Sequence, residues 1–230
     1  MESKRGMFGA SERARQPTAT YFLLLSMALI TAVLSVASDS LATLIFRSFS
    51  LVPNMVLRGG DIYTLVTYMF LHSNWMHFAL NAVALLAAGV VVERDIGSDR
   101  FVVLFFLSGI VAGLVHSIAY PSSGIPVVGA SGAIFGVIAV LFLLMPFKIT
   151  FALLVPLPAV LLGILLILTE TYSAVFGLDP TIAHFAHLGG FAFGTLYAFL
   201  IDAKRATRGL LIAVLVYLTL YLLSRWLLPL

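Results

Sequence analysis

Residues 128–145 read VGASGAIFGVIAVLFLLM, a run of apolar and small residues that contains no charged side chain. A helix of about 17–25 predominantly apolar residues is long enough to cross the hydrocarbon core of a bilayer. Runs of similar character stand on both sides of this one. The sequence therefore predicts an all-α polytopic membrane protein with spans near residues 21–37, 75–92, 101–120, 128–145, 147–169, 182–201 and 209–228.

The amino-acid composition favours the same class. Of the 230 residues, 61% are hydrophobic and 10% are charged, and the mean hydropathy is +1.10. A soluble domain is about a quarter charged, so a chain with this composition needs lipid as the solvent for most of its surface. The chain contains no cysteine, which excludes disulfides, thiol catalysis and Cys-ligated metals. No internal repeat or second domain is visible.

The basic residues predict the orientation of the chain. The net charge of +3 arises from Lys and Arg in the gaps between apolar runs, which is a topology signal and not the signature of a nucleic-acid site. If residues 1–20 are a short cytoplasmic tail, ten basic residues face the cytoplasm and three face outward, so we expect a cell-membrane protein with a cytoplasmic N-terminus. The ten are Lys4, Arg5, Arg13, Arg15, Arg94, Arg100, Lys148, Lys204, Arg205 and Arg208, and the three are Arg47, Arg58 and Arg225.

The segment 38–74 is too apolar for a solvated loop, yet it does not read as one clean span. It contains Pro53, Gly59 and Gly60 between its apolar residues. Such a composition is typical of a segment that lies along the membrane interface.

Polar residues inside the spans are costly and are functional candidates. His77, Ser131 and His187 each fall within the first turns of a span that begins on the outer face. Because the helical rise is about 1.5 Å per residue, the three side chains are expected at a common depth. His77 and Asn81 are four residues apart and share a helix face. A serine, a histidine and a His/Asn pair could supply a nucleophile, a base and oxyanion donors.

Glycines next to these residues predict that the helices touch. Gly132 and Gly136 follow Ser131, and Gly190 and Gly194 follow His187, each pair with small-xxx-small spacing. This spacing lets helix backbones approach closely in lipid. Close approach is required because a serine hydroxyl must come within about 3 Å of its base.

Each feature also has a simpler interpretation. A lone Gly-x-Ser-Gly or a glycine pair most often serves helix packing. His184 and His187 could bind a metal together with His77 or His116, but no carboxylate is expected at that depth in these helices. We therefore expect neither a metal nor a cofactor. The shared depth on alternate spans is what favours nucleophilic catalysis.

Three motifs resemble those of rhomboid intramembrane serine proteases, over about residues 59–200. The first resembles the family's GxSG signature, the second its paired histidines before an asparagine, and the third its histidine followed by GxxxG. A further resemblance lies in the turn after the second span. The matching residues are Gly129-Ala130-Ser131-Gly132 with Gly136, His72 to His77 with Asn81, Ala186-His187 with Gly190 and Gly194, and Glu93-Arg94 with Gly97.

The resemblance implies a role for each residue. Ser131 would be the nucleophile and His187 its general base, in a dyad without an aspartate. His77 and Asn81 would join the Ser131 backbone N–H in the oxyanion hole near the outer face. Helix five would be a lateral gate and the loop 170–181 would cap the site. Residues implied to support the dyad are Gly129, Gly132, Phe135, Gly190 and Gly194.

The same resemblance implies an architecture and a substrate class. Residues 21–203 would form a six-helix catalytic domain, with residues 209–230 as a seventh, C-terminal transmembrane helix. Substrates would be transmembrane proteins, cleaved in or near their membrane-spanning segments. Three positions depart from the family pattern: Tyr63-Thr64 stands where many members have Trp-Arg, and Phe135 stands where many have tyrosine.

Two other functions remain open. The first is a catalytically inactive rhomboid-like protein that binds membrane clients, although Ser131 and His187 are both retained. The second is a transporter for small solutes or metals that uses the histidines. Such a transporter would usually show symmetric halves or broken helices, and no such repeat is seen.

Overall fold

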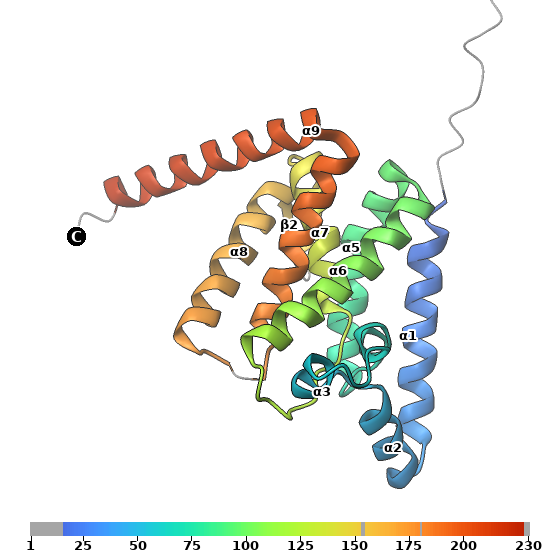
Figure 1. The fold of residues 1–230 in the computed structure, drawn as a ribbon. Helices are drawn as coiled ribbons and strands as arrows, with labels where there is room; N and C mark the ends of the chain where they lie inside the picture. The colour runs from blue at the N-terminus through green and yellow to red at the C-terminus, as the bar shows by residue number, and fades with distance from the viewer. Residues whose placement is uncertain (1–15, 153–154, 180, 228–230) are drawn as a thin grey trace, which may run out of the picture.

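The computed structural model describes residues 16–152, 155–179 and 181–227. In this part of the chain, five helices are long and apolar enough to cross a membrane. The long helices are α1 (Thr18–Val36), α5 (Trp75–Ile96), α6 (Ser98–Ala119), α8 (Ala159–Phe176) and α9 (His184–Leu227), and a shorter apolar one is α7 (Ser131–Leu144). Four of the long helices pack around α7, and the fifth, α1, packs against α5 and α6 at the edge of the bundle (Figure 1). The all-α polytopic class is thus confirmed.

Helix α7 lies at the centre of the bundle. It contacts α5, α6, α8 and α9, and every residue after Ser131 is buried. Burial on all sides explains why this segment is uniformly apolar and lacks a polar stripe. With 14 residues, α7 is roughly 21 Å long. It is therefore shorter than the bilayer core of about 30 Å.

Glycines bring α7 and α9 into backbone contact. A Cβ atom on Gly190 would overlap the carbonyl group of Gly132, and one on Gly194 would overlap the carbonyl group of Gly136. The four glycines thus form two facing pairs, as the small-xxx-small spacing predicts. Any larger side chain at Gly190 or Gly194 would push the two helices apart, because the obstructing atoms are backbone atoms.

The segment 38–74 consists of four short helices. They are α2 (Asp39–Phe49), α3 (Pro53–Leu57), α4 (Thr64–Thr67) and the 3-10 helix η1 (Tyr68–Phe70). Helix α2 buries none of its residues within the protein. A backbone bridge between Leu51 and Val127 ties the segment to the stretch that precedes α7. The predicted position at the membrane interface stays a prediction.

Two hydrogen bonds anchor this segment where its sequence departs from the rhomboid pattern. The Tyr63 hydroxyl donates to the Ser48 carbonyl at 2.8 Å, and the Thr67 hydroxyl donates to the Phe49 carbonyl at 2.8 Å. Both acceptors lie at the end of α2. Tyr63 therefore serves as an anchor although the Trp-Arg pair is missing.

The predicted span 147–169 is wrong at both ends. A two-stranded antiparallel hairpin, β1 (Ile149–Ala152) and β2 (Val155–Pro158), occupies its beginning, and α8 runs from Ala159 to Phe176. Pro156 and Pro158 lack the N–H that a helix interior needs, and they suit a short edge strand instead. Gly177, in the left-handed conformation, ends α8. Residue 170 therefore lies within a helix and not in the predicted capping loop.

Helix α9 covers the two C-terminal spans that the sequence predicts. Asp202 interrupts it with non-helical angles (φ −153°, ψ 89°), and the part after this kink projects away from the bundle (Figure 1). Arg205 stabilises the kink by an ion pair with Asp95 at 2.9 Å and a hydrogen bond to the Leu144 carbonyl at 3.2 Å. The division into a 21–203 domain and a 209–230 helix stays a prediction, and residues 1–15 and 228–230 lie outside the described residues.

A buried glutamate ties α1 to the turn between α5 and α6. The Glu93 carboxylate accepts hydrogen bonds from the backbone N–H groups of Ala19 and Thr20 at 2.8 and 2.7 Å. It also accepts from the hydroxyls of Thr20 and Ser98, both at 2.6 Å. Glu93 is 1% exposed. The first turn of α1 is thus capped by a residue from another helix.

Candidate active site

Ser131 is the first residue of α7, and a strained turn presents it. Gly129, two residues earlier, has φ +116°, a conformation that favours glycine. Its N–H donates to the Tyr68 carbonyl at 2.9 Å. A Cβ atom at Gly129 would lie 2.7 Å from Nε2 of His77. Glycine is therefore needed here both for the turn and for the approach of the His77 ring.

His187 lies in the first turn of α9 and meets Ser131 across the glycine contact. Its Nε2 is 2.7 Å from Ser131 Oγ. His187 is 8% exposed. If Nδ1 carries the ring proton, Nε2 accepts the serine hydroxyl proton, which is the arrangement of a nucleophile with its base. The sequence predicted this pair, and the structure brings it within hydrogen-bond distance.

Phe135 stacks on the imidazole of His187. The ring centroids are 4.3 Å apart and the planes differ by 6°. Phe135 lies one turn after Ser131, so α7 carries both the nucleophile candidate and the aromatic platform. Stacking of this kind restricts rotation of the imidazole about its side-chain bonds.

If the Ser131–His187 pair is catalytic, Phe135→Tyr should keep near-normal activity and Phe135→Leu should lose several-fold in kcat. The stack uses the ring and not a hydroxyl, and aromatic pairs contribute roughly 0.5–1.5 kcal/mol beyond burial. The measurement is steady-state cleavage of a transmembrane substrate beside thermal unfolding. Equal kcat for the leucine variant at unchanged thermal stability would make Phe135 an ordinary packing residue.

His77 faces the Ser131 turn from the start of α5. Its ring lies against Gly129, and its Nδ1 is 3.2 Å from the Ser73 hydroxyl. If that hydroxyl donates to Nδ1, Nε2 of His77 carries a proton and is a donor on the side of Ser131. Asn81 lies one turn further along α5, is buried, and donates to the His77 carbonyl at 2.9 Å.

His72 packs edge-on against His77, with ring centroids 5.1 Å apart. It precedes α5 in the connecting segment. Burial, together with the neighbouring His77, lowers the pKa of His72 to about 4. His72 is therefore uncharged at neutral pH and adds no positive charge to this part of the site.

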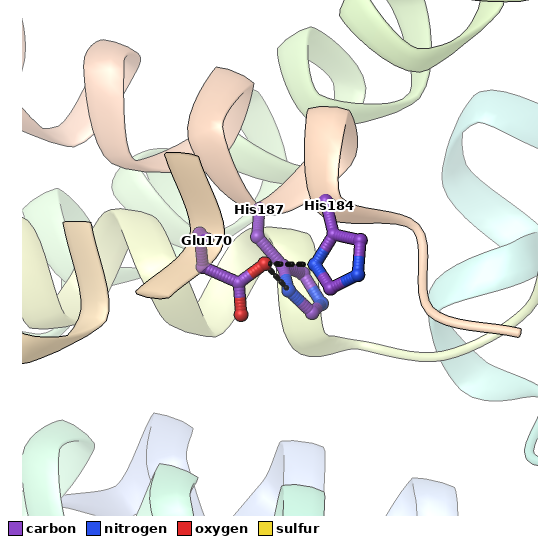
Figure 2. A group of neighbouring side chains, drawn as sticks. All are labelled: Glu170, His184 and His187. Carbon is purple, nitrogen blue, oxygen red and sulfur yellow. Dashed lines mark hydrogen bonds and ion pairs between the residues drawn. The ribbon is translucent and has the colours of Figure 1, made fainter. Parts of the chain in front are cut away.

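Sequence reasoning missed Glu170. Its Oε2 lies 2.6 Å from Nδ1 of His184 and 3.1 Å from Nδ1 of His187 (Figure 2). The expectation that no carboxylate shares the depth of the histidines is therefore wrong. The shifted α8 is the physical reason, because it carries Glu170 inward to face α9. A lone acidic residue within the apolar run 161–176 was the available signal.

The two histidines meet Glu170 differently. The contact to His184 is a hydrogen bond, and the opposite nitrogen of His184 lies 2.9 Å from the Leu178 carbonyl. The contact to His187 is within ion-pair distance, but Nδ1 of His187 is buried and has no aligned hydrogen-bond partner among the described residues. We therefore treat the His187 contact as electrostatic.

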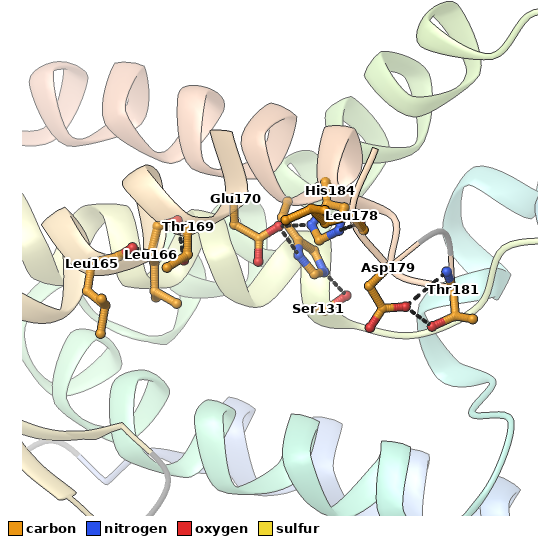
Figure 3. A network of polar contacts seen from close by, with 10 residues as sticks. Ser131, Leu165, Leu166, Thr169, Glu170, Leu178, Asp179, Thr181 and His184 are labelled. Carbon is orange, nitrogen blue, oxygen red and sulfur yellow. Dashed lines mark hydrogen bonds and ion pairs between the residues drawn. The ribbon is translucent and has the colours of Figure 1, made fainter. Parts of the chain in front are cut away.

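The turn between α8 and α9 covers His184. Asp179 accepts hydrogen bonds from the hydroxyl and the backbone N–H of Thr181 (Figure 3). These hydrogen bonds, with the hydroxyl contact the stronger, lower the pKa of the Asp179 carboxyl. The turn holds the Leu178 carbonyl against the His184 ring.

The chain is similar to known proteins over the region that contains this site. The family model described as the rhomboid domain matches residues 59–204. "Rhomboid protease GluP" of Bacillus subtilis (strain 168) is 31% identical over 140 residues, which cover 61% of this chain and 27% of that protein. "RHOMBOID-like protein 1" of Arabidopsis thaliana is 31% identical over 146 residues, which cover 64% of this chain and 36% of that protein.

A fungal relative is more similar over a shorter region. "Rhomboid-type serine protease 2" of Emericella nidulans is 38% identical over 128 residues, which cover 55% of this chain and 24% of that protein. The chain thus spans between about a quarter and a third of the length of these relatives.

Proposed function

The chain belongs to the rhomboid family of intramembrane serine proteases, and we propose that it is itself an active endopeptidase that cleaves transmembrane proteins in or near their spans. The observation that carries this proposal is the 2.7 Å contact between Ser131 Oγ and His187 Nε2. Two glycine pairs support that contact by letting α7 and α9 touch at the backbone.

In the proposed reaction, Ser131 Oγ attacks the carbonyl carbon of the scissile peptide bond. The hydroxyl proton moves to Nε2 of His187, and the ring then donates it to the leaving amine. Water hydrolyses the resulting acyl-enzyme by the same route in reverse. Glu170 lies beside Nδ1 of His187, where its negative charge stabilises the imidazolium that forms.

Oxyanion stabilisation is assigned to the Ser131 backbone N–H with His77 and Asn81. Ser131 begins α7, so its N–H belongs to the unpaired donors of a helix N-terminus. His77 faces the same turn. Donors held in place before the reaction stabilise negative charge without reorganisation.

We further propose that the N-terminus is cytoplasmic and that the site opens toward the outer face of the cell membrane. The charge bias of ten basic residues against three supports this orientation. Because α7 is shorter than the bilayer core, Ser131 at its outer end lies below the headgroups in this arrangement. Water would then reach the dyad through the polar residues around Ser131.

A fluorophosphonate test separates an active enzyme from an inactive client-binding relative. We expect the purified chain to form one covalent adduct, which mass spectrometry assigns to Ser131, because only a base-activated serine displaces the leaving group readily. Denatured protein should not react. Ser122→Ala, which removes an exposed serine, should label normally. No adduct, or an adduct on another serine, would contradict the proposal.

A further inference from the structure

We propose that Glu170, His184 and His187 form a binding site for Zn²⁺, and that the bound ion inhibits the protease by occupying Nδ1 of His187 (Figure 2). Inhibition rests on the proposed serine mechanism, whereas binding of the ion does not. The site joins α8 to α9 beside the dyad.

The donor set suits this ion. One carboxylate oxygen and two imidazole nitrogens lie within 4.8 Å of one another. Zn²⁺ takes such ligands at about 2.0–2.2 Å, commonly with three from the protein and water in the fourth position. A tetrahedral ion then holds its ligands roughly 3.3 Å apart. The present separations from Glu170 Oε2, 2.6 and 3.1 Å, are close to that value. The two imidazole nitrogens lie within 4.8 Å of each other, and side-chain rotation would bring them to the ligand spacing.

His184 is held in the orientation of a metal ligand. Its Nε2 lies 2.9 Å from the Leu178 carbonyl, and a carbonyl can only accept, so Nε2 carries a proton. The other nitrogen, Nδ1, points at Glu170. Metal-binding histidines usually donate their second N–H to a carbonyl or carboxylate in this way. The separation of 2.6 Å between His184 Nδ1 and Glu170 Oε2 requires a proton between the two atoms, and Zn²⁺ would replace and release it.

His187 supplies an independent observation. Its Nδ1 is buried and makes no hydrogen bond among the described residues, although Glu170 Oε2 lies 3.1 Å away. A buried polar atom without a partner is costly and calls for an explanation. This atom faces the same carboxylate oxygen as Nδ1 of His184. A bound ion would satisfy it.

Inhibition follows because the two nitrogens of the His187 ring share a single proton. A neutral imidazole carries a single ring proton. With Zn²⁺ on Nδ1 of His187, that proton must lie on Nε2, which then donates to Ser131 Oγ across the 2.7 Å contact. Nε2 can no longer accept the serine proton. The ion would therefore block the proposed general base.

Binding is measured on the full chain with Ser131→Ala, which leaves all three ligands in place. After treatment with EDTA and removal of the chelator, calorimetric titration with ZnCl₂ should show one ion per chain. In the same background, His184→Ala and Glu170→Gln should each weaken Zn²⁺ affinity by at least about 10–100-fold. His116→Ala, a histidine of α6 outside the group, should not. Absence of binding, or affinity unaffected by both ligand variants, would overturn the site.

Inhibition is measured on the wild-type chain. Cleavage should persist in EDTA, fall as ZnCl₂ reaches its dissociation constant, and return on chelation, while MgCl₂, which prefers oxygen ligands, has no effect. Zinc binding without any cleavage in EDTA would support the site and reject the proposed protease. Cleavage that continues with zinc bound would overturn the inhibition. Cleavage that requires zinc would overturn both the inhibition and the serine mechanism.

Discussion

Replacing Ser131 with alanine is expected to abolish cleavage of a transmembrane substrate, and His187→Ala is expected to do the same. Each change removes one member of the 2.7 Å pair. In a soluble serine protease, loss of either member costs about 10⁶ in kcat. The double variant should lose no more than either single one, because the two residues act as a unit. The measurement is single-turnover cleavage in detergent or liposomes.

Loss of cleavage supports the serine mechanism only if the variants remain folded. Ser131 precedes the buried part of α7, and its truncation to alanine removes little volume. The alanine variant should therefore unfold near the wild-type temperature. His116→Ala serves as the matched histidine control, since His116 is also buried in a neighbouring helix. Cleavage by Ser131→Ala at the wild-type rate would refute the serine mechanism.

Removing the oxyanion donors is expected to have the next largest effect. Asn81→Ala and His77→Ala should each lower kcat by about 10²–10³ while KM changes little, because the donors act on charge that develops only in the transition state. His77 faces the turn that carries Ser131, and Asn81 follows it on the same helix face.

The matched control for Asn81 is Asn54→Ala, an asparagine in α3 within the segment 38–74, which should cleave normally. Steady-state kinetics with one substrate separates kcat from KM for all three variants. An increase in KM alone would show that His77 and Asn81 bind substrate and do not stabilise the oxyanion.

Much of this architecture could be predicted from the sequence because lipid imposes a simple rule. A segment that crosses a bilayer must be long, apolar and helical, so hydropathy found α1, α5, α6 and α7 to within a few residues. It predicted α9 as two separate spans, which meet near the kink at Asp202. The pairing of Ser131 with His187 followed from depth and from the glycines between their helices. The order of the helices along the chain was enough to place Ser131 and His187 at a common depth.

The region 147–176 could not be predicted in the same way. Hydropathy does not distinguish an apolar hairpin from an apolar helix, and β1 and β2 contain no charged residue. Because of this error, the prediction assigned Glu170 to a loop, whereas the residue lies in a helix. The prediction also left the Glu170 carboxylate out of the expected site. A metal site of Glu170, His184 and His187 could therefore not be recognised from the sequence.

The carboxylate of Glu93 has a consequence for the order in which the protein assembles. Helix α1 has no side-chain cap of its own at Pro17, and its first N–H groups bond to a residue 73–74 positions later. During translation, α1 is made well before Glu93. Ser98, which donates to the same carboxylate, is made later still. The first turn of α1 therefore stays without this partner until one further long helix, α5, has been almost completely made. A nascent fragment that stops before residue 93 therefore lacks the group that fastens its first helix.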